Sequence, residues 1–363
     1  MNDRSIGRLR HIDGLRGIAA IVVLYQHLVE YLGTLAPHGA LMRAHMDWTL
    51  DYLDLGKFGV VVFFAVSGYI VPFSFGAEAP RLRFVVSRFF RLYPAYWLSL
   101  LIAVLLLPII SVNTFSAAQV VANATMMQTL LGQQNILGVY WTLPIELIFY
   151  GLCFLLHSAG LLYNARAQLI LFTAMLGLAL LGSVARQSGH DAIPVALPLY
   201  LATMFWGTNM RLATLERDAL ARRHGIPMLL ALLVMIPLVW SIAYDDNSHK
   251  ESVLAVITAC MFALLLFLLV LRRRMFTSAP LAYLGAISYS IYLFHPLALE
   301  VGAYVSHLGT WPKGLVLAVV AVTLTLFAAH VAYKCVEQPA IRLGRRLMEA
   351  LSPSRAAPSF NSR

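Results

Sequence analysis

The chain has 363 residues, of which 60% are hydrophobic and only 12% are charged. A soluble domain carries about twice that share of charged residues, so the composition excludes a soluble enzyme and favours a polytopic membrane protein. The net charge of +10 lies mostly in short loops, and we interpret it as a signal of membrane orientation rather than of nucleic-acid binding.

Apolar stretches long enough to cross a bilayer follow one another along the whole chain. We expect an all-α fold with about ten transmembrane helices. They form a single domain, residues 1–342, and a basic, disordered cytoplasmic tail follows, residues 343–363. The expected spans are 14–33, 58–76, 94–112, 138–157, 167–184, 193–210, 227–244, 252–271, 282–305 and 314–335.

Basic residues are distributed unevenly between the two sides of this arrangement. Of the 27 lysines and arginines, only Arg43, Lys57, Arg186, Lys250 and Lys313 fall on one side, and all the others fall on the side of the two chain ends. Cytoplasmic loops are enriched in basic residues. We therefore expect a multi-pass membrane protein with both termini in the cytoplasm.

The first apolar run and the residues before it read HIDGLRGIAAIVVLYQHLVEYL. Arg16 stands at the entrance, and His27 follows eleven positions later on the same helical face, about 16 Å along the axis. An ionisable group that deep in an apolar segment is a functional hypothesis by default, facing a cavity or a bundle interior. The alternative is a histidine that merely bonds a neighbouring carbonyl.

Three ionisable side chains are expected at similar depth in the outer half of the membrane: His27, Glu146 and His295. We expect Glu146 to pair with His27, orienting the imidazole as a general base for a hydroxyl. Two structural alternatives stay open. Glu146 could instead bond Tyr150, one turn later, and His295 could hold the backbone loosened by Pro296.

A second cluster lies in VVSRFFRLYPAYW, where Arg88 and Arg91 are neighbours on a helical face. Together with Arg16 they would form a cationic entrance for a phosphorylated ligand, unless they serve membrane orientation alone. Ser67, beside Gly68 in the second span, is either an acyl-enzyme nucleophile without an assigned base or, as we prefer, a small-residue helix contact. The neutral, polar loop 113–137 suits contact with sugar hydroxyls as well as it suits solvent.

These residues belong to motifs in which the chain resembles the membrane acyltransferase family 3. The motifs are the Arg16–His27 spacing, KFGVVVFFAVSGYIV, SRFFRLYPAYW, YWTLPIELIFY, SYSIYLFHP and VEQPAIRL, in family order from residue 11 to residue 342. Members O-acylate surface saccharides and some small molecules. One departure concerns the fourth motif, where two adjacent acidic positions are common, whereas Ile145 and Leu147 flank Glu146 here.

The resemblance implies an O-acyltransferase that moves an acyl group, acetyl above all, from cytoplasmic acyl-CoA to a hydroxyl of a saccharide or lipid-linked glycan. Acyl-CoA would be a co-substrate, with no permanently bound cofactor and no metal. The implied catalytic residues are His27, Glu146 and Arg16, and the implied acyl-CoA-binding residues are Arg16, Arg88 and Arg91. Supporting roles fall to Trp141, Tyr150, Ser67 and His295.

A rival interpretation is a proton-coupled transporter or flippase of a glycan or small molecule, because buried histidine and glutamate also build proton relays. A membrane scaffold would leave the buried ionisable groups unexplained. Stabilisation by coenzyme A would distinguish the acyltransferase from the transporter.

Overall fold

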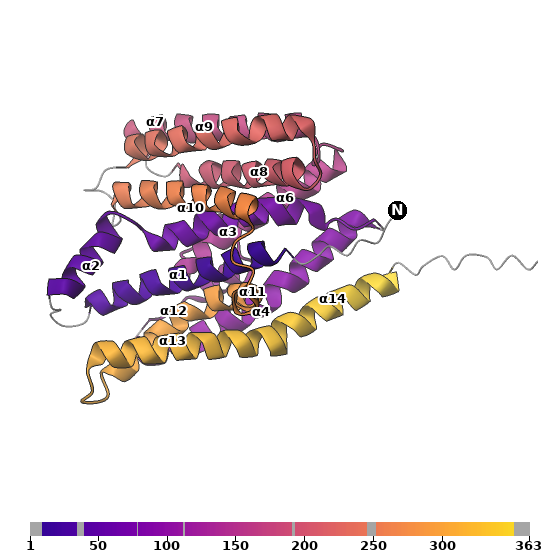
Figure 1. The fold of residues 1–363 in the computed structure, drawn as a ribbon. Coiled ribbons are helices and arrows are strands. Elements are labelled where there is room, and N and C mark those ends of the chain that lie inside the picture. The colour runs from indigo at the N-terminus through magenta and orange to yellow at the C-terminus, as the bar shows by residue number, and fades with distance from the viewer. Residues whose placement is uncertain are drawn as a thin grey trace, which may run out of the picture.

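The computed structural model describes residues 9–34, 40–77, 79–111, 113–190, 193–244 and 252–351. Every regular element within these ranges is helical, which confirms the all-α fold (Figure 1). Eight of the described helical segments are long and apolar enough to cross a membrane, and a bent pair of helices raises the number to nine. The chain is therefore a multi-pass membrane protein.

The helices follow the expected spans with a few additions. The first half of the chain forms α1 (Arg10–Thr34), α2 (Ala40–Asp51), α3 (Leu55–Ile70), the short η1 (Val71–Ser74), α4 (Pro80–Ile110), α5 (Ala117–Ala124), η2 (Gly138–Thr142) and α6 (Leu143–Ser158). The second half forms α7 (Ala165–Gln187), α8 (Ala196–Thr214), α9 (Ala219–Ala243), α10 (Val253–Arg273), α11 (Ala279–Ala286), α12 (Ser288–Ser306), α13 (Lys313–Ala332), the π-helix η3 (Tyr333–Glu337) and α14 (Gln338–Leu351). The expectation did not include α2 and α5.

The third span begins much earlier than expected, at Pro80 rather than at residue 94. Pro94 lies inside α4 and does not open it, because the preceding segment RLRFVVSRFFRLY already alternates apolar and basic residues at helical spacing. Arg88 and Arg91 are therefore one turn apart on a long continuous helix. Both side chains face a cavity between the helices of the bundle.

The ninth expected span is divided into α11 and α12, which are bent by 69° relative to each other. Near the bend, Gly285 packs directly on α1, where an added Cβ would lie 1.8 Å from the carbonyl oxygen of Asp13. Pro296 lies inside α12 without breaking it. The bend therefore lies where α11 packs closely on α1. Helix α12 continues along the bundle.

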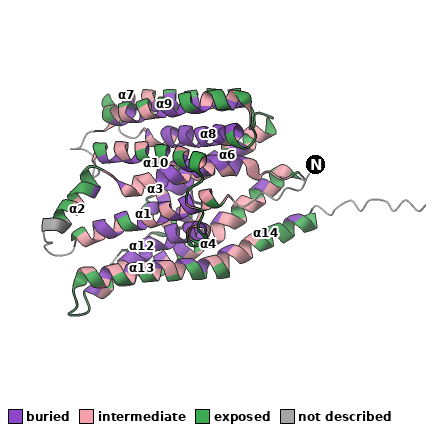
Figure 2. Ribbon diagram, viewed as in Figure 1, coloured by how far each residue is buried: buried purple, intermediate pink, exposed green. Residues whose placement is uncertain are grey.

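The sixth expected span is α8, which has 19 residues and is buried along almost its whole length (Figure 2). It is not among the eight strongly apolar segments. Its polar residues Thr203, Thr208 and Asn209 face protein, and Gly68 of α3 approaches so closely that a Cβ there would lie 2.0 Å from the carbonyl oxygen of Met204. Small residues at such contacts let helices approach closely in membranes.

The expected tail at 343–363 needs a correction. Residues up to Leu351 belong to α14, whose sequence QPAIRLGRRLMEAL is amphipathic and buries Gly344 and Met348. Gly344 lies against the ring of Phe90 in α4. An amphipathic helix is stabilised when its apolar face packs against a neighbouring helix. Residues 352–363 lie outside the described part of the chain.

Helix α1 occupies the middle of the bundle, in contact with α3, α11 and α12. Figure 1 shows α7 and α9 forming the upper edge of the view, and α13 and α14 the lower edge. α1 begins and α14 ends on the right of that view, whereas the 307–312 connection lies on the left. The side chains of α1 can therefore meet those of several other helices at both ends of the bundle.

Candidate active site

The three expected arginines, Arg16 of α1 and Arg88 and Arg91 of α4, line one cavity of about 130 Å³. We call it the arginine cavity. Its walls come from α1, α3, α4, α6 and α12, and its lining also includes Ser67, Thr142, Glu146, Tyr150, Ser288, Tyr289 and Tyr292. The structure thus brings together residues that are far apart in the sequence, as the sequence predicted for the arginines.

Arg91 is held by Glu337, a carboxylate that the sequence analysis did not single out. The two side chains form an ion pair, and the other oxygen of Glu337, Oε2, accepts a hydrogen bond of 2.9 Å from the Ser290 hydroxyl. Glu337 is fully buried and ends the π-helix η3. π-Helical turns are often found at functional sites. The motif VEQPAIRL contained the signal, since a carboxylate inside an apolar segment requires a partner.

Arg88 lies over two aromatic rings, 5.7 Å from the ring centroid of Tyr150 and 6.0 Å from that of Phe84. Such cation–π contacts orient a guanidinium without neutralising its charge. Glu146 Oε1 accepts hydrogen bonds from the Tyr150 hydroxyl at 2.5 Å and from the Ser67 hydroxyl at 3.3 Å. The alternative that Glu146 bonds Tyr150 is therefore confirmed.

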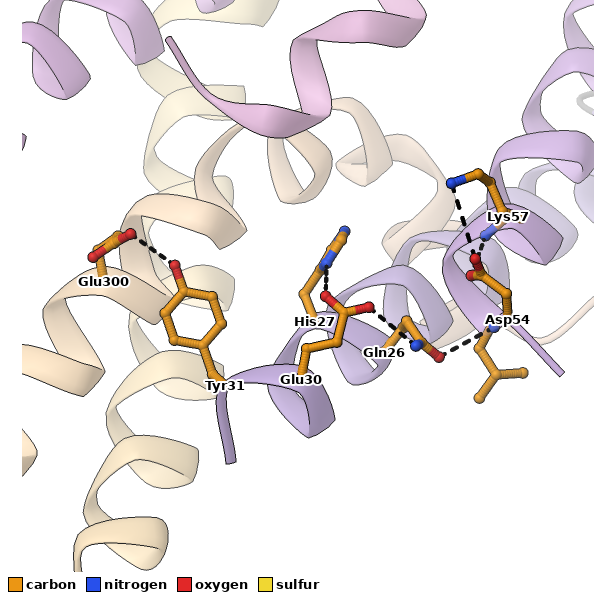
Figure 3. Close-up of polar contacts among 8 residues, drawn as sticks. Gln26, His27, Glu30, Tyr31, Asp54, Lys57 and Glu300 are labelled. Atoms are coloured by element: carbon orange, nitrogen blue, oxygen red, sulfur yellow. Dashed lines mark hydrogen bonds and ion pairs between the residues drawn. The ribbon is translucent and has the colours of Figure 1, made fainter. Parts of the chain in front are cut away.

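His27 lines a second cavity of about 340 Å³, which we call the histidine cavity. Its partner is Glu30, one turn later on α1: the Nδ1 atom of His27 lies 2.8 Å from Glu30 Oε2. Figure 3 shows that this carboxylate also accepts from Gln26, whose Nε2 lies 3.1 Å from Glu30 Oε1. The Gln26 carbonyl oxygen in turn accepts the backbone N–H of Leu55 at 3.2 Å. The chain of bonds ties the imidazole to the start of α3.

The pairing of His27 with Glu146 is thus wrong, because the two side chains line different cavities and Glu30 occupies the position next to the imidazole. Glu30 was present in the sequence quoted for this helix, three residues after His27. The i, i+3 spacing was a usable signal, since residues three apart are neighbours on a helix. Glu146 is separated from His27 by the way α6 packs in the bundle. The expected depth of a residue in the membrane gives no information about its lateral position.

His295 does meet His27, as their expected similar depth suggested. The two imidazole rings are stacked with their centroids 5.3 Å apart and their planes 19° from parallel. His295 is fully buried, and its Nδ1 lies 3.1 Å from the Ile291 carbonyl oxygen. Its Nε2 finds no hydrogen-bond partner in the part of the chain that the structure describes. His295 therefore packs against the His27 ring and is absent from the linings of both cavities.

Lys57, in the first turn of α3, brings a cation to the histidine cavity. Its ammonium lies 3.9 Å from Asp54 Oδ2 and 5.5 Å from the ring centroid of Trp141, which lines the same cavity. Tyr31, also in the lining, donates a 2.8 Å hydrogen bond to Glu300 of α12. These contacts give the cavity polar walls with one large aromatic surface.

The two cavities are neighbours that share Val60 and Tyr292 in their linings. Arg16 lines one cavity and His27 lines the other, about 16 Å farther along α1 by the rise of an α-helix. The N-terminal turns of α3 line the histidine cavity, and its later turns line the arginine cavity. The two cavities thus lie next to each other along α1, with three arginines in one and an oriented imidazole in the other.

A model of the membrane acyltransferase family 3, described as an acyltransferase domain, matches residues 9–332. Similar proteins include nodulation protein 10 of Rhizobium leguminosarum bv. viciae, which is 24% identical over 96% of this chain and 97% of its own length. An O-acetyl transferase of Shigella phage Sf6 is 23% identical over 90% of this chain and 94% of its own length.

A putative membrane-bound transacylase of Komagataeibacter xylinus, BcsY, is 26% identical over 82% of this chain and 74% of its own length. No solved structure matches the chain.

Proposed function

We infer the reaction of this chain from the premise that it belongs to the membrane acyltransferase family 3. It is a membrane-bound acyltransferase that carries out O-acyl transfer. The rival interpretation as a transporter is thereby set aside. The donor, the acceptor, the residues and the orientation proposed below are supported by the two neighbouring cavities, one with three arginines and the other with the His27–Glu30 pair.

The proposed donor is acyl-CoA, with acetyl-CoA as the commonest case, and it is a co-substrate rather than a resident cofactor. Its phosphates would contact Arg16, Arg88 and Arg91, because guanidinium groups bind phosphate through paired hydrogen bonds. The pantetheine arm would then extend past Val60 and Tyr292 to bring the thioester to the histidine cavity. On the basic-residue distribution, the arginine cavity opens to the cytoplasm of a bacterial inner membrane and both termini lie on that side.

The proposed general base is His27. Its Nδ1–H donates to Glu30, so the Nε2 lone pair is available to take the proton of an acceptor hydroxyl. The acceptor oxygen attacks the thioester carbonyl carbon and the C–S bond breaks. The departing thiolate then takes the proton from the imidazolium. Glu30 stabilises the imidazolium while it exists, as a carboxylate beside a catalytic histidine does.

The proposed acceptor is a saccharide or a lipid-linked glycan entering the histidine cavity. Trp141 offers an aromatic surface there, and the backbone and side chains around Gln26 offer polar contacts of the kind that orient ligands. The lining carries two carboxylates, Glu30 and Asp54, against one cation, Lys57. Neutral hydroxyl-bearing acceptors therefore suit this cavity better than anionic ones.

The test uses membranes that contain the full chain and acetyl-CoA labelled in the acetyl group. We expect label in the glycolipid or polysaccharide fraction, and we expect His27→Ala to lower the rate at least about 100-fold because a general base is lost. Arg16→Ala should raise KM for acetyl-CoA about tenfold, because one charge-assisted hydrogen bond to the donor phosphates is lost.

His190→Ala and Arg166→Ala are matched controls, since both residues are exposed and lie outside the two cavities. Transfer at the wild-type rate by His27→Ala would contradict the assignment of the base. An acceptor that becomes acetylated without taking up the label of the added acetyl-CoA would contradict the assignment of the donor.

A further inference from the structure

A third cavity, of about 230 Å³, lies among the neighbouring helices α8, α9 and α10 (Figure 1). Within the described part of the chain it shares no lining residue with the arginine cavity or the histidine cavity, so the proposed acyl transfer makes no use of it. Arg222, Ile226 and Arg272 of its lining are exposed. The cavity therefore opens at the surface of the bundle, and we call it the α9–α10 cavity.

Two cations line this cavity, Arg222 in the first turn of α9 and Arg272 in the last turn of α10. In the ranges that the structure describes, neither guanidinium forms an ion pair, and no aspartate or glutamate lines the cavity. The acidic residues close to Arg222 in sequence have other partners: Glu216 Oε1 lies 3.5 Å from Arg211 Nε, and Asp218 caps the start of α9. A phosphate suits two such guanidinium groups, because each of them can donate two hydrogen bonds to its oxygens.

The face of α9 that carries Arg222 is apolar farther along the helix. Ile226 and Leu230 follow Arg222 at intervals of four residues, so the three side chains lie one above the other. Ile226 lines the cavity, and both apolar side chains are exposed. Because α9 is one of the membrane-spanning helices, we infer that these exposed apolar side chains face the lipid hydrocarbon.

Helix α10 repeats this pattern in the opposite direction. Counting back from Arg272, Leu268 and Leu265 lie four and seven residues away, on the same helical face. Leu268 lines the cavity and Leu265 is exposed. The cations of the two helices therefore lie at the same end of the cavity, and an apolar stripe leads away from each of them.

We propose that the α9–α10 cavity binds one anionic phospholipid of the surrounding bilayer. The lipid phosphate is held by Arg222 and Arg272, and the acyl chains extend along Ile226 and Leu268. Basic pockets between transmembrane helices are typical binding sites for lipid head groups. A soluble phosphate shares the head-group chemistry but has no apolar part that could cover the two stripes. The proposal is independent of the acyl transfer proposed above.

The test uses the full chain, purified in detergent and titrated with phosphatidylglycerol, phosphatidylcholine or inorganic phosphate. Bound lipid is counted by native mass spectrometry, and the melting temperature is measured in parallel. The variants are Arg222→Gln and Arg272→Gln. Their matched controls are Arg223→Gln and Arg273→Gln, because these neighbouring arginines are exposed, carry the same charge and are absent from the cavity lining.

We expect the wild type to bind one phosphatidylglycerol with a Kd at least about tenfold below that for phosphatidylcholine, and to be stabilised against heat by it. Arg222→Gln and Arg272→Gln should each raise this Kd about tenfold, because one charge-assisted hydrogen bond to the phosphate is lost. Each control should stay within about twofold of the wild type. Inorganic phosphate should leave the melting temperature unchanged at the same concentration.

Three outcomes would overturn the proposal. Equal affinity for the two lipids would show that the cavity does not recognise a negative head group. Equal losses in all four variants would reduce the effect to the overall surface charge. Equal stabilisation by inorganic phosphate and by phosphatidylglycerol would make the cavity a site for a soluble anion. Since none of these measurements requires acyl transfer, a chain that binds the lipid as expected but transfers no acyl group would contradict the proposed function alone.

Discussion

The imidazole of His27 is oriented by Glu30, its neighbour one turn later on the same helix. The hydrogen bond fixes which ring nitrogen carries the proton and leaves the other to act on substrate. Gln26 completes the arrangement by donating to the same carboxylate. A short local motif on α1 therefore contains a base, its orienting carboxylate and the support for that carboxylate.

Glu30→Gln tests this arrangement. The amide keeps the size of the side chain and removes the charge that stabilises the imidazolium. We therefore expect kcat to fall about 10- to 100-fold, which corresponds to the loss of one hydrogen bond to a charged group. KM for acetyl-CoA should stay near the wild-type value, because Glu30 does not line the arginine cavity. The measurement is steady-state transfer of labelled acetyl groups. An unchanged kcat would show that the His27 proton is controlled by another group.

At the scale of elements, the π-helix η3 joins α13 to α14 and ends at Glu337, whose carboxylate contacts Arg91 of α4 and Ser290 of α12. One buried side chain thus links three helical elements at the arginine cavity. A buried carboxylate is costly unless it is paired and hydrogen-bonded, and both conditions are met here. The pairing sets the direction in which Arg91 can face the cavity.

Glu337→Gln is expected to raise KM for acetyl-CoA about tenfold, because the amide no longer holds the Arg91 guanidinium by charge. kcat at saturating acetyl-CoA should change much less, since the reacting atoms lie in the other cavity. Glu349→Gln, an exposed position on α14, is the matched control. Both variants are compared by steady-state kinetics and by melting temperature in detergent. A fall in kcat without a change in KM would count against a role in donor binding.

In the molecule as a whole, two adjacent cavities differ in the charge of their linings. The arginine cavity gathers cations from α1 and α4, whereas carboxylates and an aromatic surface dominate the histidine cavity. A ligand with phosphates at one end and a thioester at the other would fit this polarity. Long-range charge attraction would also favour entry from the arginine end.

Arg88→Gln tests the charge at that end. We expect the rise in melting temperature caused by coenzyme A to be smaller than in the wild type, because each tenfold loss of affinity removes about 1.4 kcal/mol of ligand stabilisation. Arg273→Gln, at the exposed end of α10, is the control. Added salt should weaken the wild-type effect more than the effect in Arg88→Gln. Equal stabilisation of both variants would remove Arg88 from the donor site.

The membrane class, the helical fold and the positions of most spans could be predicted from the sequence, because apolar runs and their lengths depend only on local composition. The sequence also indicated Arg16, Arg88 and Arg91 as one cluster, and the structure confirms that they share a cavity. The start of α4 at Pro80 and the division of α11 from α12 did not follow from hydropathy, which reports apolar length and not bends.

The partners of the buried carboxylates depend on how the helices pack in three dimensions. Glu146 and His27 have similar expected depths, yet the packing of α6 against α8 and α4 places Glu146 beside Ser67 and Tyr150. Depth along one helix fixes a single coordinate, whereas a contact needs the rotation and lateral position of both helices. Those are set by close packing at residues such as Gly68 and Gly285, whose backbone neighbours come from distant parts of the chain.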